Sequence, residues 1–187
     1  FVGANEEWSS ASSITQTRGR HAATLLDNGQ TLVSGGSTDS GNSRSTTELY
    51  DPKNDRWDLS GTTHEERMSH TATKLQDGRV LIAGGTNDSR ESLDSVEIYD
   101  PARKAWAIAQ AMSVPRQGHT MTLLADGRVL VVGGMNDWDA IYASAEIFDP
   151  STGAWTPTGP MASPRVQHTA TLLPNGKALV TGGLSDG

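Results

Sequence analysis

The chain has 187 residues, a formal net charge of −7 and no cysteine. It can therefore form no disulfide bond, thiolate metal site or cysteine nucleophile, and its acidic composition argues against nucleic acid or an anionic membrane as the main partner. No apolar run approaches the roughly 20 residues of a membrane-spanning helix. Because the chain starts at Phe1, we expect that its N-terminus was removed or that it was cut from a longer chain. The composition leaves the location open, and we favour a secreted or cell-surface protein.

The landmark residues recur at a fixed interval of 49 residues, as from His21 to His70. A repeat of this length predicts a stacked or circular array whose units share one core. The chain holds 187/49, or about 3.8, repeats. The positions that share the period are His21, His70, His119 and His168; Gly35-Gly36, Gly84-Gly85, Gly133-Gly134 and Gly182-Gly183; and Trp8, Trp57, Trp106 and Trp155.

Each repeat predicts four short strands, which the second repeat illustrates. Residues 70–75 form the first strand, followed by Asp77-Gly78, a pair that tolerates the positive φ of a tight hairpin turn. Residues 80–83 are continuously apolar, which is typical of a central strand that is covered on both faces. After a loop over residues 86–94, a third strand covers 95–99 and ends before Pro101, which has no N–H to donate. A fourth strand begins near Trp106, and we expect its flat indole ring to lie on the glycine pair.

The spacing of Gly84-Gly85, Tyr99 and Trp106 resembles the signature of the Kelch repeat, and the third repeat repeats it with Gly133-Gly134, Phe148 and Trp155. The form Arg-x-x-His-Thr-Ala-Thr is similar to the bacterial variety. The resemblance covers nearly the whole chain and implies an all-β fold, a β-propeller of four-stranded antiparallel blades. It also implies that the strand after each histidine is the innermost strand of its blade. It does not imply an activity, because propellers host both enzymes and binding scaffolds.

We interpret residues 1–187 as a single propeller domain or propeller fragment. Whole repeats lie near residues 18–66, 67–115 and 116–164, and a split repeat combines 165–187 with 1–17. The split repeat could close a four-bladed ring, or the chain could be part of a larger or oligomeric propeller. If the strand edges do not close within one chain, they should pair between chains, which makes a homo-oligomer plausible.

The charged and polar repeat positions suggest structural roles. We expect each arginine to pair with a carboxylate and so tie the entry of the first strand to the third strand. We expect each histidine to bond the backbone of its own blade, although a ring of four imidazoles could bind a metal. Asp39, Asp88, Asp137 and Asp186 should fold back on their own loops as Asx turns. The arginines at this position are Arg18, Arg67, Arg116 and Arg165, and the carboxylates are Glu48, Glu97 and Glu146. A ring of these arginines could instead hold an anionic ligand.

A ligand-binding face is best sought where the repeats differ. The loops between second and third strands share one face with the connections between repeats and are longer than the turns opposite, so we place any ligand there. The loop of the third repeat carries Trp138 and Tyr142, where the matching loops have no aromatic residue. Exposed aromatic side chains suit a sugar or a protein partner. The candidate residues of this face are Asn87, Arg90, Asn136, Trp138, Asp139 and Tyr142.

The sequence predicts a binding or assembly scaffold for protein or carbohydrate rather than an enzyme. It contains no nucleophile–base constellation, and we expect no catalytic residue, no cofactor and no metal. The invariant repeat length also favours a near-symmetric interaction module. Two alternatives remain: the propeller part of a larger glycan-active enzyme, and a structural subunit that assembles through its split blade.

Overall fold

The structure is a computed structural model that describes residues 9–137 and 140–185. The described part of the chain forms fourteen strands and no helix. The strands make three sheets of four strands and one sheet of two, and in each sheet neighbouring strands follow one another along the chain and run antiparallel. Each sheet is one blade, so the 49-residue repeat of the sequence corresponds to one blade of the fold.

The strand bounds repeat closely from blade to blade, except that β3 and β4 of the first blade are longer than their counterparts. The first blade contains β1 (Ala22–Leu25), β2 (Thr31–Ser34), β3 (Arg44–Asp51) and β4 (Arg56–Arg67), and the second contains β5 (Thr71–Lys74), β6 (Val80–Ala83), β7 (Val96–Asp100) and β8 (Ala105–Ala109). The third contains β9 (Thr120–Leu123), β10 (Val129–Val132), β11 (Ala145–Asp149) and β12 (Ala154–Thr158), and the last contains β13 (Thr169–Leu172) and β14 (Ala178–Thr181). The expected strands are confirmed, with ends that differ by about one residue.

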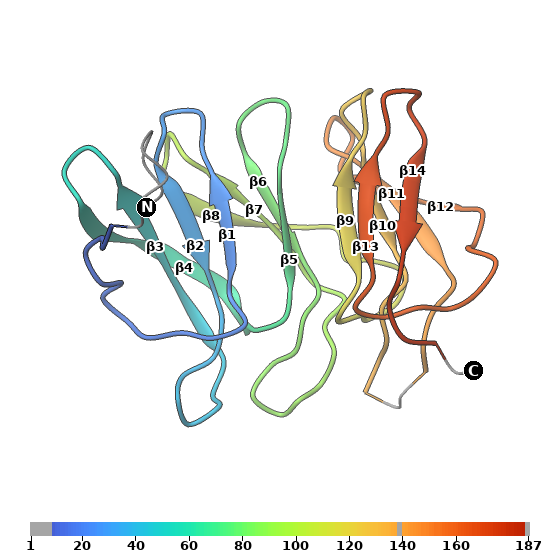
Figure 1. The fold of residues 1–187 in the computed structure, drawn as a ribbon, viewed down its shortest axis with the longest axis horizontal. Coiled ribbons are helices and arrows are strands. Elements are labelled where there is room, and N and C mark those ends of the chain that lie inside the picture. The colour runs from blue at the N-terminus through green and yellow to red at the C-terminus, as the bar shows by residue number, and fades with distance from the viewer. Residues whose placement is uncertain (1–8, 138–139, 186–187) are drawn as a thin grey trace.

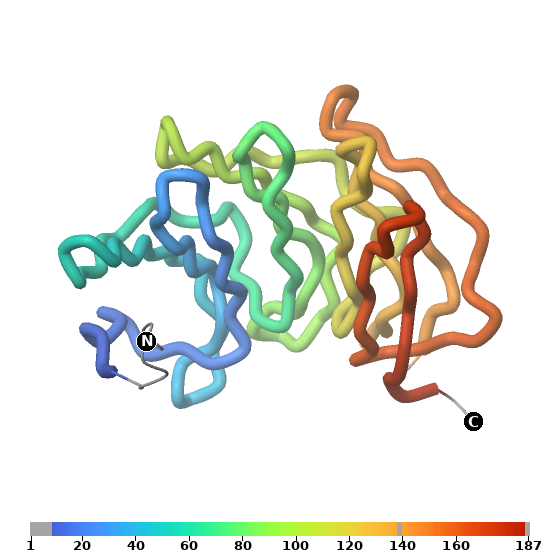
Figure 2. The backbone as a smooth tube through the Cα atoms, turned by 45° about the horizontal axis from the view of Figure 1, so that its top comes forward, coloured from blue at the N-terminus to red at the C-terminus, as the bar shows by residue number. Residues whose placement is uncertain are grey.

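The blades form an arc rather than a closed ring. Strands β1, β5, β9 and β13 are neighbours in that order, which makes the first strand of each blade the innermost. Figure 1 and Figure 2 show the first blade and the β13–β14 sheet at opposite ends of the molecule. The described residues of one chain therefore do not close a four-bladed ring through the split repeat.

The two faces of the arc differ in the way the sequence predicts. The hairpin turns at residues 27–30, 76–79, 125–128 and 174–177 lie on one face, here called the turn face. The loops at residues 35–43, 84–95 and 133–144 extend from the opposite face, here called the loop face, and are seen at the bottom of Figure 1. The innermost strands run between these two faces.

The segment before the first blade packs on that blade. Ser12 donates its backbone N–H to Asp55 Oδ1 over 2.9 Å, and its carbonyl accepts a bond from Trp57 Nε1 at 2.9 Å. Gln110, at the end of β8, accepts the same bond from Trp155 at 2.8 Å. Residues near Ser12 therefore occupy the place that the end of a fourth strand occupies between whole blades. Trp8, expected in that fourth strand, lies outside the described residues.

Two hydrophobic clusters fill the spaces between blades. One joins Leu26, Leu32 and Leu49 of the first blade to residues of the second blade, including Tyr99 and Trp106. The other joins the second blade to Val129, Val131 and Phe148 of the third. The side chains at their centres are almost completely inaccessible to solvent, and their burial is the main force that holds neighbouring blades together.

The expectation that the tryptophans lie on the glycine pairs is wrong. Trp106 pairs across the sheet with Tyr99, their ring centroids 5.1 Å apart, and Tyr99 in turn lies opposite Val80 at the start of β6. The glycine pair follows the other end of β6, so the indole and the glycines lie at opposite ends of the blade. The indole packs against the preceding blade, and its Nε1 is 3.4 Å from Thr47 Oγ1.

No helix among the described residues is long and apolar enough to cross a membrane.

Candidate binding face

Each glycine pair turns the chain out of the sheet where two blades meet. Gly84 and Gly85 have φ angles of +63° and +93°. A Cβ atom on Gly84 would lie 2.3 Å from the carbonyl oxygen of Arg116 and 2.8 Å from the ring of His119, both in the next blade. Only a residue without a side chain fits this close approach. Contact with the next blade therefore explains why glycine is required here, and packing of a tryptophan ring on the glycine pair does not.

A buried arginine–glutamate pair lies beside the glycine pair of each blade that has four strands. Arg67 Nη2 donates to Glu97 Oε1 at 3.0 Å, and Arg67 Nη1 donates to the Gly84 carbonyl at 3.0 Å. Glu97 also accepts the backbone N–H groups of His64 and Glu65. Burial lowers the pKa of Arg67, and Coulombic attraction to Glu97 opposes that shift. The predicted ion pair, which joins the segment before the first strand to the third strand of the same blade, is therefore present.

The same pair recurs in the other whole blades. Arg18 and Glu48 are 2.6 Å apart, and Arg116 and Glu146 are 3.1 Å apart. Arg165 donates to the Gly182 carbonyl at 2.7 Å but has no carboxylate partner among the residues that the structure describes. In the blades that have all four strands, each guanidinium is thus held by its own third strand.

Three of the four histidines contact a hydroxyl group of the preceding blade through Nε2, a link between blades that the sequence did not predict. His70 Nε2 lies 3.0 Å from Ser34 Oγ of the preceding blade, and His119 Nε2 lies 2.6 Å from Thr71 Oγ1. Burial lowers the pKa of both histidines to about 3, so their rings are neutral at physiological pH. His168 and Thr120 repeat the contact at 3.0 Å. His21, in the first blade, differs, because its Nδ1 lies 3.2 Å from the Arg18 carbonyl of its own blade.

The loop aspartates also act between blades. Asp88 accepts the backbone N–H and the hydroxyl of Ser43 in the preceding loop, and Asp137 accepts the backbone N–H of Ser92. The expected Asx turn on their own loops is therefore wrong for these two residues. The asparagine before each aspartate makes the local turn instead: Asn87 Oδ1 accepts the Glu91 N–H at 3.0 Å. The side chains of the loop face thus form a network that fixes each loop against the next.

The residue before each histidine has left-handed backbone geometry. The φ angles at this position are +53°, +56°, +61° and +56° for Arg20, Ser69, Gly118 and Gln167. The Ser69 N–H donates to the Arg20 carbonyl at 2.9 Å, and the Gln167 N–H donates to the Gly118 carbonyl at 2.8 Å. This backbone geometry is sterically unfavourable for the residues other than glycine, and the hydrogen bonds between blades compensate for that cost.

A cavity of about 550 Å³ lies on the loop face. Arg20 and Arg90 line it, and neither side chain forms an ion pair with another described residue. Arg90, at the tip of the second loop, is exposed and has a φ of +62°. The remaining lining residues come from the strand entries and the loops of the first three blades: Ser37, Gly41, Met68, Thr86 and Gln117.

Comparison with known proteins agrees with the repeat, the blade topology and the glycine pairs. Residues 3–183 match the model of the KLHDC2/KLHL20/DRC7 Kelch-repeats domain. The chain belongs to the Kelch-repeat family. The solved structure titled "Structure of YjhT" is similar with a TM-score of 0.76 and 15% sequence identity, over 90% of this chain and 60% of that one. At this identity the likeness concerns the fold alone, and the chain spans about 60% of that structure's length. A search of curated protein sequences found no match.

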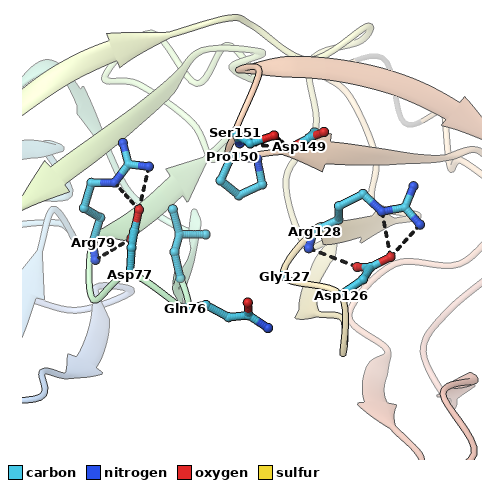
Figure 3. Close-up of a pocket in the computed structure, with 10 residues that line it drawn as sticks. Gln76, Asp77, Arg79, Asp126, Gly127, Arg128, Asp149, Pro150 and Ser151 are labelled. Carbon is cyan, nitrogen blue, oxygen red and sulfur yellow. Dashed lines mark hydrogen bonds and ion pairs between the residues drawn. The ribbon is translucent and has the colours of Figure 1, made fainter.

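The Kelch chain has a second set of concavities on its turn face, one of which Figure 3 shows. Grooves of about 310 and 380 Å³ lie between adjacent blades at equivalent positions. Their arginines are already paired, because Arg79 contacts Asp77 and Arg128 contacts Asp126 at 2.7 Å each. These grooves therefore offer an anion less free positive charge than the cavity of the loop face does.

Of the described residues predicted to bind a ligand, one lines the loop-face cavity and the others make contacts within the chain. Arg90 lines the loop-face cavity, whereas Asn87 and Asn136 hold their own loops together. Tyr142 is half-buried, and Arg116 lies 5.4 Å from its ring centroid, so its aromatic face is used inside the blade. Trp138 and Asp139 lie outside the described residues. Arg20 was missed, because its position differs in residue type from repeat to repeat and carries no motif.

Proposed function

We propose that this Kelch chain is a non-enzymatic binding module that holds a protein or glycan partner at its loop face. The observation that carries the proposal is the pairing state of the arginines. The arginines of the strand entries and turns contact carboxylates or carbonyls, while Arg20 and Arg90 line a cavity without an ion pair among the described residues. In a chain with a net charge of −7, two free guanidinium groups in one cavity favour a carboxylate-bearing ligand.

Calorimetric titration with two acidic probes tests this function. A short polyglutamate peptide represents an acidic protein segment, and an oligogalacturonate represents an acidic glycan. We expect at least one probe to bind, with an affinity that falls as salt rises. Arg20→Gln and Arg90→Gln should each weaken that binding by about tenfold, the effect of losing roughly 1.4 kcal/mol from a charged hydrogen bond.

The control is Arg128→Gln, which removes an exposed arginine from the opposite face. It should leave the affinity unchanged. Failure of both probes to bind, or an equal loss in the control, would contradict the proposal. The probe that binds more tightly decides between a protein and a glycan partner.

A second function, self-assembly, is favoured by the end of the arc. The β13–β14 sheet has two strands among the described residues, and Leu179 and Leu184 are 48% and 63% exposed there. An unpaired strand edge with apolar side chains promotes association. Sedimentation velocity over a hundredfold range of concentration tests it, and a monomer at every concentration would rule it out.

A further inference from the structure

The outer edge of the second blade differs from the outer edges of the other whole blades. Strand β8 is the last strand of its sheet, and among the described residues it pairs only with β7. Natural proteins usually protect such an edge with charges, proline or a bulge. Strand β12 has Pro157, and β4 has charged residues and register shifts against β3. The second blade has Ala107, Ile108 and Ala109 in the corresponding places and carries none of these protections.

A groove of about 450 Å³ runs beside this edge. Ala105, Ala107 and Ala109 line it, and they share one face of β8 because side chains alternate along a strand. The first blade has Arg56, Asp58 and Ser60 at the three positions 49 residues earlier. The space beside β8 therefore exists because the second blade carries methyl groups where the first blade carries larger or polar side chains.

The other wall of the groove belongs to the third blade. It is formed by Phe148 and by the turn at residues 150–153 between β11 and β12. Ile98, half-buried on β7, adds an apolar floor. On the opposite face of β8, the face that neighbours β4 of the first blade, Ile108 is 71% exposed. The site thus combines unpaired backbone groups with apolar surface on both sides of the strand.

One end of the groove is basic. Arg103 lines it beside Asp100, Arg79 lines it while paired with Asp77, and Lys104 immediately precedes β8. The Arg103 side chain is 83% exposed, and its nearest carboxylate contact, to Asp100, is 3.5 Å long. Positive charge at the start of β8 lies next to the end of any strand that would pair with it in the antiparallel sense.

We propose that β8 accepts an extended segment of a partner protein as a fifth antiparallel strand. Backbone hydrogen bonds to the free edge supply the pairing, and bulky apolar side chains at alternate positions fill the groove over the three alanines. Carboxylates at the C-terminal end of the segment lie beside Arg103 and Lys104. This surface is separate from the loop-face cavity and does not depend on Arg20 or Arg90.

The repeat itself supplies matched variants for the test. Ile108→Pro introduces the residue that the third blade carries at this position, Pro157, which pairs opposite Glu146 as Ile108 pairs opposite Glu97. Because proline fits that register without an N–H, the N–H at position 108 points away from β7 and is available to an added strand. Ala107→Asp introduces the residue of the first blade, Asp58. Neither substitution should alter the melting temperature by more than a few degrees.

The probe is a short synthetic peptide that alternates leucine and threonine and ends in two aspartates. We expect it to bind the wild-type chain and to slow hydrogen exchange at the Ile108 amide. Ile108→Pro and Ala107→Asp should each weaken binding by at least about tenfold. Lys177→Gln, which removes an exposed basic residue that belongs to neither proposed surface, should leave it unchanged, and a peptide ending in two lysines should bind more weakly.

Four results would overturn the proposal. The first is a wild-type chain that does not bind the peptide, and the second is equal binding by the wild type and both β8 variants. The third is protection confined to amides of the loop face. Self-association of the chain that Ile108→Pro abolishes would also overturn the choice of a foreign strand, in favour of a second copy of the chain.

Discussion

The substitution of Gly84 by alanine measures how closely two blades approach. The added Cβ would lie 2.3 Å from the Arg116 carbonyl oxygen, a backbone atom that cannot move without displacing the third blade. The left-handed φ of +63° adds a penalty of about 1–2 kcal/mol for a residue with a side chain. The steric overlap adds about 1–3 kcal/mol, the usual cost of overpacking. We therefore expect a total loss of about 2–5 kcal/mol.

Gly182→Ala is the matched control, because Gly182 occupies the same repeat position with a φ of +70°. A Cβ on Gly182 would have no described atom within 4 Å. Only the conformational penalty of about 1–2 kcal/mol applies there. Both variants are compared with the wild type by urea titration and by thermal melting, where 1 kcal/mol corresponds to roughly 2–4 °C in a chain of this size. Equal losses in the two variants would refute the claim that the glycine pair is required by contact with the next blade.

Three further predictions concern the links within and between blades. Glu97→Gln leaves a buried guanidinium without its carboxylate and should lower the free energy of unfolding by about 3–5 kcal/mol, measured by urea titration; a loss below about 1 kcal/mol would contradict a buried ion pair. The pKa values of His70 and His119 are about 3 in the folded chain, below the ordinary 6.5, so the unfolded state binds more protons between these values. Stability should therefore fall as pH falls from about 6.5 toward 3, by up to about 1.4 kcal/mol per pH unit for each histidine, and a His119→Gln variant that kept the full slope would argue against this origin. Asp88→Ala should speed hydrogen exchange at the Ser43 amide while the exchange of the β6 amides stays unchanged, and an unaltered Ser43 rate would show that the link between loops is not formed in solution.

The period of the sequence was sufficient to predict the blades, because hairpin turns, apolar strands and Pro101 each mark a local boundary. The arginine–glutamate pairs could also be predicted, since both partners belong to the same repeat and share its spacing. The partners of the histidines and of Asp88 could not. They belong to the preceding blade, and a periodic sequence does not state whether a side chain points to its own repeat or to the neighbouring one.

Two other differences have a similar origin. Strand β4 extends over Arg56–Arg67, much longer than β8, because it continues into the connection and pairs Arg67 with Arg44. The cavity residue Arg20 was not predicted because a varying position leaves no periodic signal. Both features arise where the repeats cease to be alike, which is also where the two proposed binding surfaces lie.

The left-handed residue before each histidine has a consequence for how this scaffold can change. Its backbone shape is imposed by hydrogen bonds between blades, so the identity of the side chain is free to vary, as Arg20, Ser69 and Gln167 show. Gly118 is the exception, because a Cβ there would lie 2.6 Å from the Val166 side chain. Three of the four blades thus present an interchangeable group around the axis, and new recognition chemistry could be installed at those places while the architecture beneath them stays the same.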